Sequence, residues 1–65
     1  MQIILNGEPR SFEGQSIYQL LQDLGYVDKR IAVELNGEIV PKSLHADTLL
    51  NEGDQLEIVI AVGGG

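Results

Sequence analysis

The sequence predicts an α+β fold in which a mixed sheet of about five strands packs on one helix. Two Asn-Gly pairs, Asn6-Gly7 and Asn36-Gly37, each follow a run of alternating apolar and polar residues, a pattern typical of tight β-hairpins. Between the two hairpins, apolar residues recur at helical spacing from Ile17 to Leu24. The 65 residues, 43% of them apolar, suffice for one core and not for two. We therefore expect a single domain.

The first hairpin is predicted at the start of the chain. Met1, Ile3 and Leu5 are apolar positions of the outgoing strand, and the return strand runs from Glu8 to about Phe12. Pro9 lies within the return strand and has no N–H group to donate to a neighbouring strand. The return strand is therefore predicted at an edge of the sheet.

The helix is predicted to begin after Ser16. Ser16 and Gln19 have the spacing of a capping box, in which each side chain bonds the free backbone N–H of the other residue. Gly25 stands where a helix commonly ends with a left-handed residue. One apolar stripe of the helix faces the sheet and consists of Ile17, Leu20, Leu21 and Leu24.

The second hairpin is predicted in the same way, with strands at 31–35 and 38–40 that end before Pro41. Residues 43–50 show no period and are expected to be irregular, with one short turn of helix around 44–46. Three apolar residues of this segment are expected to close one end of the core, namely Leu44, Leu49 and Leu50.

The last strand is predicted to bury Leu56, Ile58 and Ile60. Because a hairpin, a helix, a second hairpin and a single strand follow one another, we expect the last strand between the two hairpins and parallel to the first strand. This arrangement is the β-grasp, or ubiquitin-like, layout. We expect it to cover residues 1–62 and to be followed by a flexible glycine tail at 63–65.

Composition narrows the possible functions. The chain has no Cys, which excludes disulfides, thiolate catalysis and Cys-ligated metals. Its formal net charge of −6 opposes binding to nucleic acid or to an anionic membrane surface. No segment approaches the roughly 20 apolar residues of a membrane span, and the first residues do not have the pattern of a leader, so a cytoplasmic location is expected.

The sequence does not indicate a conventional active site. His45 is the only His, and we expect it to be a surface or packing residue without a catalytic role. A possible metal site would consist of Glu52, Asp54 and Glu57. These residues lack the spacing of a calcium loop and are interpreted as a solvated acidic face, so no metal is expected. We therefore expect a carrier or binding protein and not an enzyme.

The chain ends in three glycines, Gly63, Gly64 and Gly65. Such an end has no side chains and can pass through a narrow channel, and its distinctive group is the terminal carboxylate of Gly65. A carboxylate accepts a nucleophile only after one of its oxygens has become a leaving group, which in cells usually means adenylation by ATP. The alternative is that the glycines form a linker or an end without function.

Several blocks of the sequence occur together in the order found in one known family. They are Ile3-Ile4-Leu5-Asn6-Gly7-Glu8, the helix from Ser16 to Leu24, Ala32-Val33-Glu34-Leu35-Asn36-Gly37-Glu38-Ile39-Val40-Pro41, Gly53-Asp54-Gln55-Leu56-Glu57-Ile58 and Val62-Gly63-Gly64. On these blocks the sequence resembles the ThiS-type sulfur carriers of thiamine thiazole synthesis, along essentially all 65 residues. The usual end of that family is a Gly-Gly pair, and the third glycine here departs from it.

The resemblance implies a carrier function, with no cofactor bound by the chain itself. A ThiF-type enzyme would use ATP and Mg²⁺ to adenylate Gly65, and a cysteine desulfurase or another sulfurtransferase would supply the sulfur of a thiocarboxylate. A ThiG-type thiazole synthase would then take this sulfur for the thiazole ring. Gly64, together with Gly63, would enter the partner active sites.

A partner-binding surface is expected on the sheet face opposite the helix. Alternation points Ile4 and Val59 outward, and with Val62 they would form an apolar area beside the tail. The alternative is that these are ordinary exposed aliphatic residues. Other functions compatible with the sequence are the small subunit of molybdopterin synthase, a ubiquitin-like modifier or binding module, and a small enzyme with an acidic site.

Overall fold

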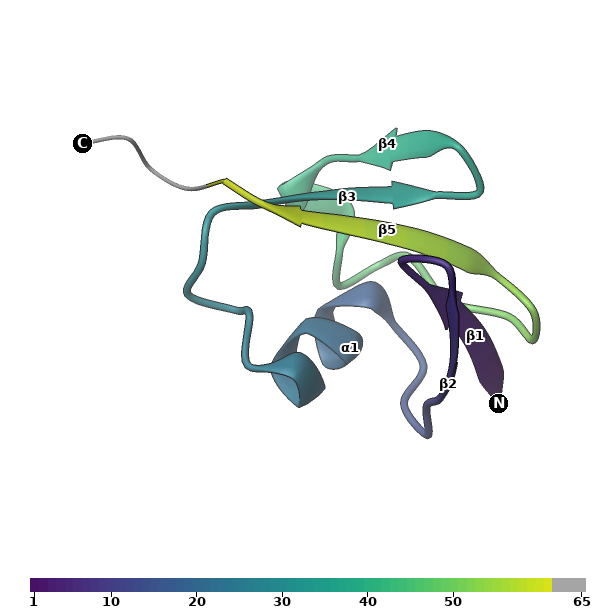
Figure 1. Ribbon diagram of the computed structural model, residues 1–65. Helices are drawn as coiled ribbons and strands as arrows, with labels where there is room; N and C mark the ends of the chain where they lie inside the picture. The colour runs from purple at the N-terminus through teal and green to yellow at the C-terminus, as the bar shows by residue number, and fades with distance from the viewer. Residues whose placement is uncertain (62–65) are drawn as a thin grey trace.

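The computed structural model describes residues 1–61 and contains, within them, five strands, one α-helix and a short 3-10 helix (Figure 1). In chain order these elements are β1 (Gln2–Leu5), β2 (Glu8–Ser11), α1 (Ile17–Leu24), β3 (Ile31–Leu35), β4 (Glu38–Val40), η1 (Lys42–Leu44) and β5 (Gln55–Ile60). The sheet has the strand order β2-β1-β5-β3-β4. β5 pairs in parallel with β1 and antiparallel with β3, so it lies between the two hairpins as predicted.

Both hairpins turn at the predicted Asn-Gly pairs. Asn6 and Asn36 each have φ of 50°, and Gly7 and Gly37 have φ of 83° and 88°. Two successive positive φ values are those of a two-residue turn whose twist matches the flanking strands, and Asn and Gly adopt them most readily. Pro9 lies in β2, which is an edge strand, so its missing N–H removes no pairing within the sheet.

The helix α1 has the predicted cap at each end. The Gln19 amide donates to Ser16 Oγ at 3.2 Å, and the Ser16 amide donates to Gln19 Oε1 at 3.1 Å, which completes the capping box. Gly25 closes the helix with φ of 77° and donates its N–H to carbonyls of the last turn. The buried stripe is Ile17, Leu20 and Leu21, with Leu24 half-buried at the end.

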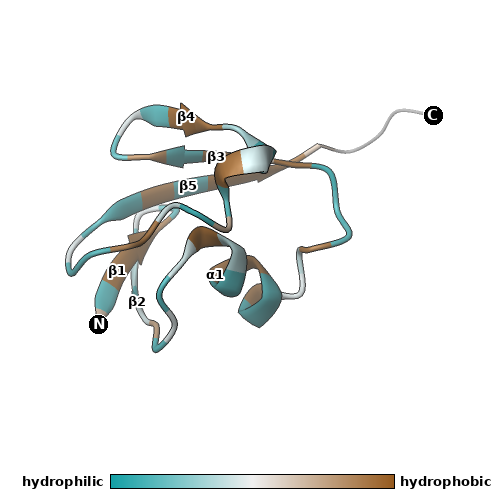
Figure 2. Cartoon of the chain, turned by 180° about the vertical axis from the view of Figure 1, so that it is seen from behind, coloured by the Kyte–Doolittle hydropathy of each residue, from teal (hydrophilic) through white to brown (hydrophobic). Residues whose placement is uncertain are grey.

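The core lies between α1 and one face of the sheet, and Figure 2 shows apolar and polar bands alternating along the strands. Its buried apolar residues are Ile3, Phe12, Ile17, Leu20, Leu21, Val33, Leu50, Leu56 and Ile58. The prediction that Ile60 is buried is wrong, because 41% of it is exposed. Ile60 pairs with Ile31 at the last position of the β3–β5 ladder, where burial along β5 has already ended at Ile58.

The segment between β4 and β5 differs from its prediction. The helical turn η1 begins at Lys42, earlier than the predicted 44–46, and Leu44 and Leu49 are 48% and 61% exposed instead of buried. His45 is buried in their place and is 4% exposed, with its Nε2 3.0 Å from the Val40 carbonyl, to which it donates. Leu50 is buried, as predicted.

Candidate functional site

The predicted glycine tail, Gly63 to Gly65, and Val62 of the predicted partner surface lie outside the residues that the structure describes. The structure does describe the strand that leads to the tail. β5 is the central strand and pairs with β3 at five positions, from Leu35↔Leu56 to Ile31↔Ile60. Beyond the strand, the Ala61 amide donates to the Arg30 carbonyl at 2.8 Å. The last described residue is therefore anchored to the middle of the sheet.

Two asparagine side chains add to the anchoring of β5. Asn6 Oδ1 accepts from the Ile58 amide at 2.8 Å, and Asn6 Nδ2 donates to the Ile58 carbonyl at 3.3 Å. Asn36 Oδ1 accepts from the Gln55 amide at 3.0 Å. From the sequence, both residues are predicted in turns only. The two turns therefore also fix the position of β5, the strand from which the glycine end follows.

The two described residues of the predicted partner surface lie on the outer sheet face, as alternation requires, and are not neighbours. Ile4 is half-buried on β1 and pairs with Gln55. Val59 is 59% exposed and pairs with Ala32 on β3. It lies four residues beyond Gln55 on β5, which is about 13 Å at the usual rise of a strand. Only Val59 therefore lies near the end of β5.

Ile39 is an exposed apolar residue of this face for which the sequence predicts no role. Its side chain is 74% exposed on β4. The pairing Val33↔Val40 turns Val40 toward the core side, so Ile39 must point outward. The outward direction of Ile39 can be predicted from the hairpin register set by Asn36-Gly37, because the register determines which residue of 38–40 faces outward. Val59 and its partner Ala32 form an exposed apolar area of the outer face, and Ile39 lies on the same face opposite Glu34.

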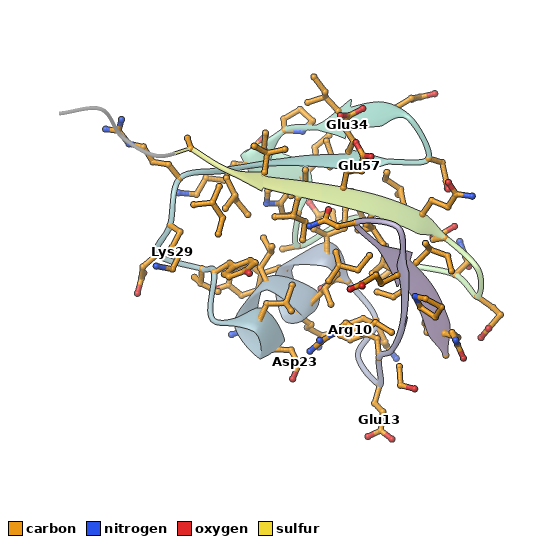
Figure 3. The ribbon with its side chains drawn as sticks, viewed as in Figure 1. Arg10, Glu13, Asp23, Lys29, Glu34 and Glu57 are labelled. Atoms are coloured by element: carbon orange, nitrogen blue, oxygen red, sulfur yellow. The ribbon has the colours of Figure 1, made fainter. Side chains whose placement is uncertain are left out.

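Two glutamates lie opposite each other beside this area. Glu34 on β3 pairs with Glu57 on β5, and Figure 3 shows both on the sheet side away from α1. Like charges at directly opposite positions repel each other. Within residues 1–61 the sole ion pair is Arg10–Asp23 at 3.4 Å, so no described cation compensates the two glutamates. The outer face therefore combines apolar side chains with negative charge.

The other acidic residues considered for a metal are used in turns. Glu52 Oε1 accepts from the Gln2 amide at 2.9 Å, and Asp54 Oδ2 accepts from the Asn51 amide at 2.8 Å. Among residues 1–61, no three His, Asp or Glu side chains come close enough to hold a metal ion. In the same part of the chain, no helix has the length and apolar character needed to cross a membrane.

Comparisons with known proteins support one family. The sequence model of the ThiS family matches residues 3–65. The sulfur carrier protein ThiS of Thermus thermophilus is 39% identical over 61 residues, which cover 94% of this chain and 95% of that protein. The crystal structure of the thiamine biosynthesis protein ThiS from Geobacter metallireducens matches with a TM-score of 0.84 and 30% identity, over the full length of both chains.

A longer relative matches as well. A thiazole synthase of Paramagnetospirillum magneticum is 47% identical over 66 aligned residues, which cover all of this chain and 20% of that protein. The chain thus spans about a fifth of the length of this relative. Three findings indicate the same family. The family model matches nearly the whole chain, a sulfur carrier of similar length is similar in sequence, and a solved ThiS structure matches over its full length. The chain has the ubiquitin-like β-grasp fold and belongs to the ThiS family.

Proposed function

We propose that this chain is a sulfur carrier whose terminal carboxylate, on Gly65, is adenylated and then converted to a thiocarboxylate. The observation that carries the proposal is the ThiS family match, which extends through the glycine end to residue 65. The central position of β5 supports it, because a strand paired on both sides is a firm base for a chain end that must reach another protein's active site.

The proposed chemistry has two steps on the terminal carboxyl group. ATP converts the carboxylate to an acyl-adenylate, and pyrophosphate leaves. A persulfide sulfur of a sulfurtransferase, such as a cysteine desulfurase, then attacks the acyl carbon, and AMP leaves. A second thiol attacks the sulfurtransferase sulfur of the resulting acyl disulfide, forms a disulfide with it and releases the thiocarboxylate. The chain is a co-substrate in this scheme, and ATP and Mg²⁺ belong to the ThiF-type adenylating enzyme.

We further propose that a ThiG-type thiazole synthase accepts the sulfur. Two relatives named thiazole synthase, from Paramagnetospirillum magneticum and Magnetococcus marinus, contain a segment similar to the whole of this chain. A carrier segment within a protein of that name supports transfer of sulfur to thiazole synthesis rather than to molybdopterin synthesis or to lysine side chains. The dependence on ATP and on a persulfide donor is consistent with the cytoplasm as the site of action.

Intact-mass spectrometry tests the proposal. The chain is incubated with ATP, a ThiF-type enzyme, a cysteine desulfurase and cysteine. We expect a mass increase that corresponds to exchange of one oxygen for sulfur, located at Gly65 by fragmentation. A chain ending at Val62 is the control and should stay unchanged. No increase with an activating enzyme that modifies its own carrier would contradict the proposal.

The third glycine requires a separate comparison. A chain ending at Gly64 keeps a Gly-Gly end and differs from the full chain by one residue. We expect the full chain to be converted faster if Gly65 is the reactive residue. Faster conversion of the shorter chain would move the reactive carboxylate to Gly64.

A further inference from the structure

Three of the four basic residues of the chain gather where β5 ends. Lys29 and Arg30 belong to the loop between α1 and β3, and Lys42 is the first residue of η1. With Ala61 they line one open groove of about 450 Å³. Figure 3 shows Lys29 on this loop, on the same side of the molecule as the end of β5. This set of Lys29, Arg30 and Lys42 is called the basic cluster below.

The basic cluster stands out against the charge of the rest of the chain. The net charge is −6, with ten acidic and four basic residues, yet Asp28 is the sole carboxylate among the described residues that line the groove. The three basic side chains are exposed. Within residues 1–61 they take part in no ion pair, since the fourth basic residue, Arg10, makes the sole one with Asp23. The cluster is therefore not used to neutralise described carboxylates of its own chain.

The position of the cluster restricts what it can contact. Ala61 lines the groove and donates its N–H to the Arg30 carbonyl, so the groove lies at the base of the glycine end. The four residues from 62 to 65 span at most about 14 Å. An enzyme that acts on the carboxylate of Gly65 must therefore place its own surface within about that distance of the basic cluster.

We propose that Lys29, Arg30 and Lys42 dock on an acidic surface at the mouth of the site in which the adenylating enzyme receives the glycine end. This inference rests on the proposed function. Three exposed cations along an open groove fit an extended protein surface better than a small free anion, because no described buried polar side chain lines the groove to enclose one. The other nine acidic side chains are outside the groove and would be repelled by the same acidic surface, so the charges orient the chain with its glycine end toward the enzyme.

Charge-neutralising variants test the docking site. The variants, made singly and together, are Lys29→Gln, Arg30→Gln and Lys42→Gln. Arg10→Gln is the matched control for each single variant, because it makes the same change in charge outside the cluster. The measurement is the kinetics of adenylation by a ThiF-type enzyme, followed by pyrophosphate release at low and high salt. Thermal unfolding checks that every variant is folded.

At low salt, we expect the kcat/KM of the triple variant to fall at least about tenfold because its KM rises. Its kcat/KM should also depend much less on salt than that of the unaltered chain. Each single variant should lose more than Arg10→Gln. The inference is overturned if the unaltered chain is adenylated and the triple variant keeps its KM. If the unaltered chain is neither bound nor adenylated, the proposed function fails together with the inference.

A titration with pyrophosphate, followed by amide chemical shifts, separates the two kinds of anion. We expect no saturable shifts at residues 29, 30 and 42 with pyrophosphate alone. Saturable shifts there, together with an unchanged KM of the triple variant, would show a small-anion site and overturn the protein docking site.

Discussion

Asn6 shows how one residue can set a turn and also fix a distant strand. Its φ of 50° suits Asn or Gly, and its side chain bonds both the N–H and the carbonyl of Ile58. β1 ends at Leu5, so this side chain continues the pairing with β5 after the backbone has turned away. A single residue at the tip of the first hairpin therefore stabilises the strand that leads to the glycine end.

Asn6→Gly separates the two roles of this residue. Glycine keeps the positive φ but loses both side-chain hydrogen bonds, so the Ile58 backbone groups must find water. We expect a loss of about 1–3 kcal/mol in the free energy of unfolding, measured by urea denaturation. Asn6→Asp keeps the acceptor for the Ile58 amide and should lose less than Asn6→Gly. A loss for Asn6→Gly below about 0.5 kcal/mol would show that these hydrogen bonds do not contribute.

Some single-residue features could not be predicted because they depend on tertiary contacts. His45 is buried because its ring reaches the Val40 carbonyl, and no spacing in the sequence indicates that contact. The Asn6 bond to Ile58 joins residues 52 positions apart. In contrast, the outward direction of Val59 and Ile39 follows from alternation and hairpin register, which are local properties.

At the scale of elements, the helix is tied to the segment that follows the second hairpin. The Ile17 amide donates to the Thr48 carbonyl and the Tyr18 amide to the His45 carbonyl, both at 3.0 Å. These are free N–H groups of the first helical turn, which a helix cannot satisfy within itself. Residues 45–48 therefore serve as a second cap for α1, in addition to the capping box.

Leu20→Ala tests the packing of α1 on the sheet. Leu20 is fully buried, so its truncation removes apolar contacts and leaves a cavity. We expect a loss of about 2–5 kcal/mol in the free energy of unfolding, measured by urea denaturation.

Gln22→Ala is the control for this prediction, because Gln22 is exposed on the same helix. Its effect should stay within about 0.5 kcal/mol. Equal effects of the two variants would contradict the placement of Leu20 in the core.

The sequence predicted the regular elements well because each has a local cause. Periodic apolar residues and the Ser16–Gln19 box define α1, and the two Asn-Gly pairs define the hairpins. The segment 41–50 has no such period, and its conformation depends on contacts with α1 and β4. This is the physical reason that Leu44 and Leu49 were predicted to be buried and are exposed.

At the scale of the whole molecule, the strand order could be predicted because few arrangements suit a hairpin, a helix, a hairpin and a final strand. The charge distribution could not be predicted in this way. Lys29 and Arg30 are neighbours in sequence, but Lys42 is distant from them and joins them only because η1 lies near the end of β5. The grouping of these basic residues near the glycine end therefore depends on the fold, whereas the glycine end itself is visible in the sequence.

Removal of Gly64 and Gly65 tests whether folding and carrier function are separate. Among residues 1–61, the nine buried apolar residues lie between Ile3 and Ile58, and the last described strand ends at Ile60. We therefore expect the shortened chain to keep its free energy of unfolding within about 0.5 kcal/mol. It should bind the adenylating enzyme through its folded surface, yet release no pyrophosphate, since its terminal carboxylate, now on Gly63, is two residues short of the position that Gly65 reaches. Unfolding of the shortened chain, or adenylation at an unchanged rate, would each contradict this separation.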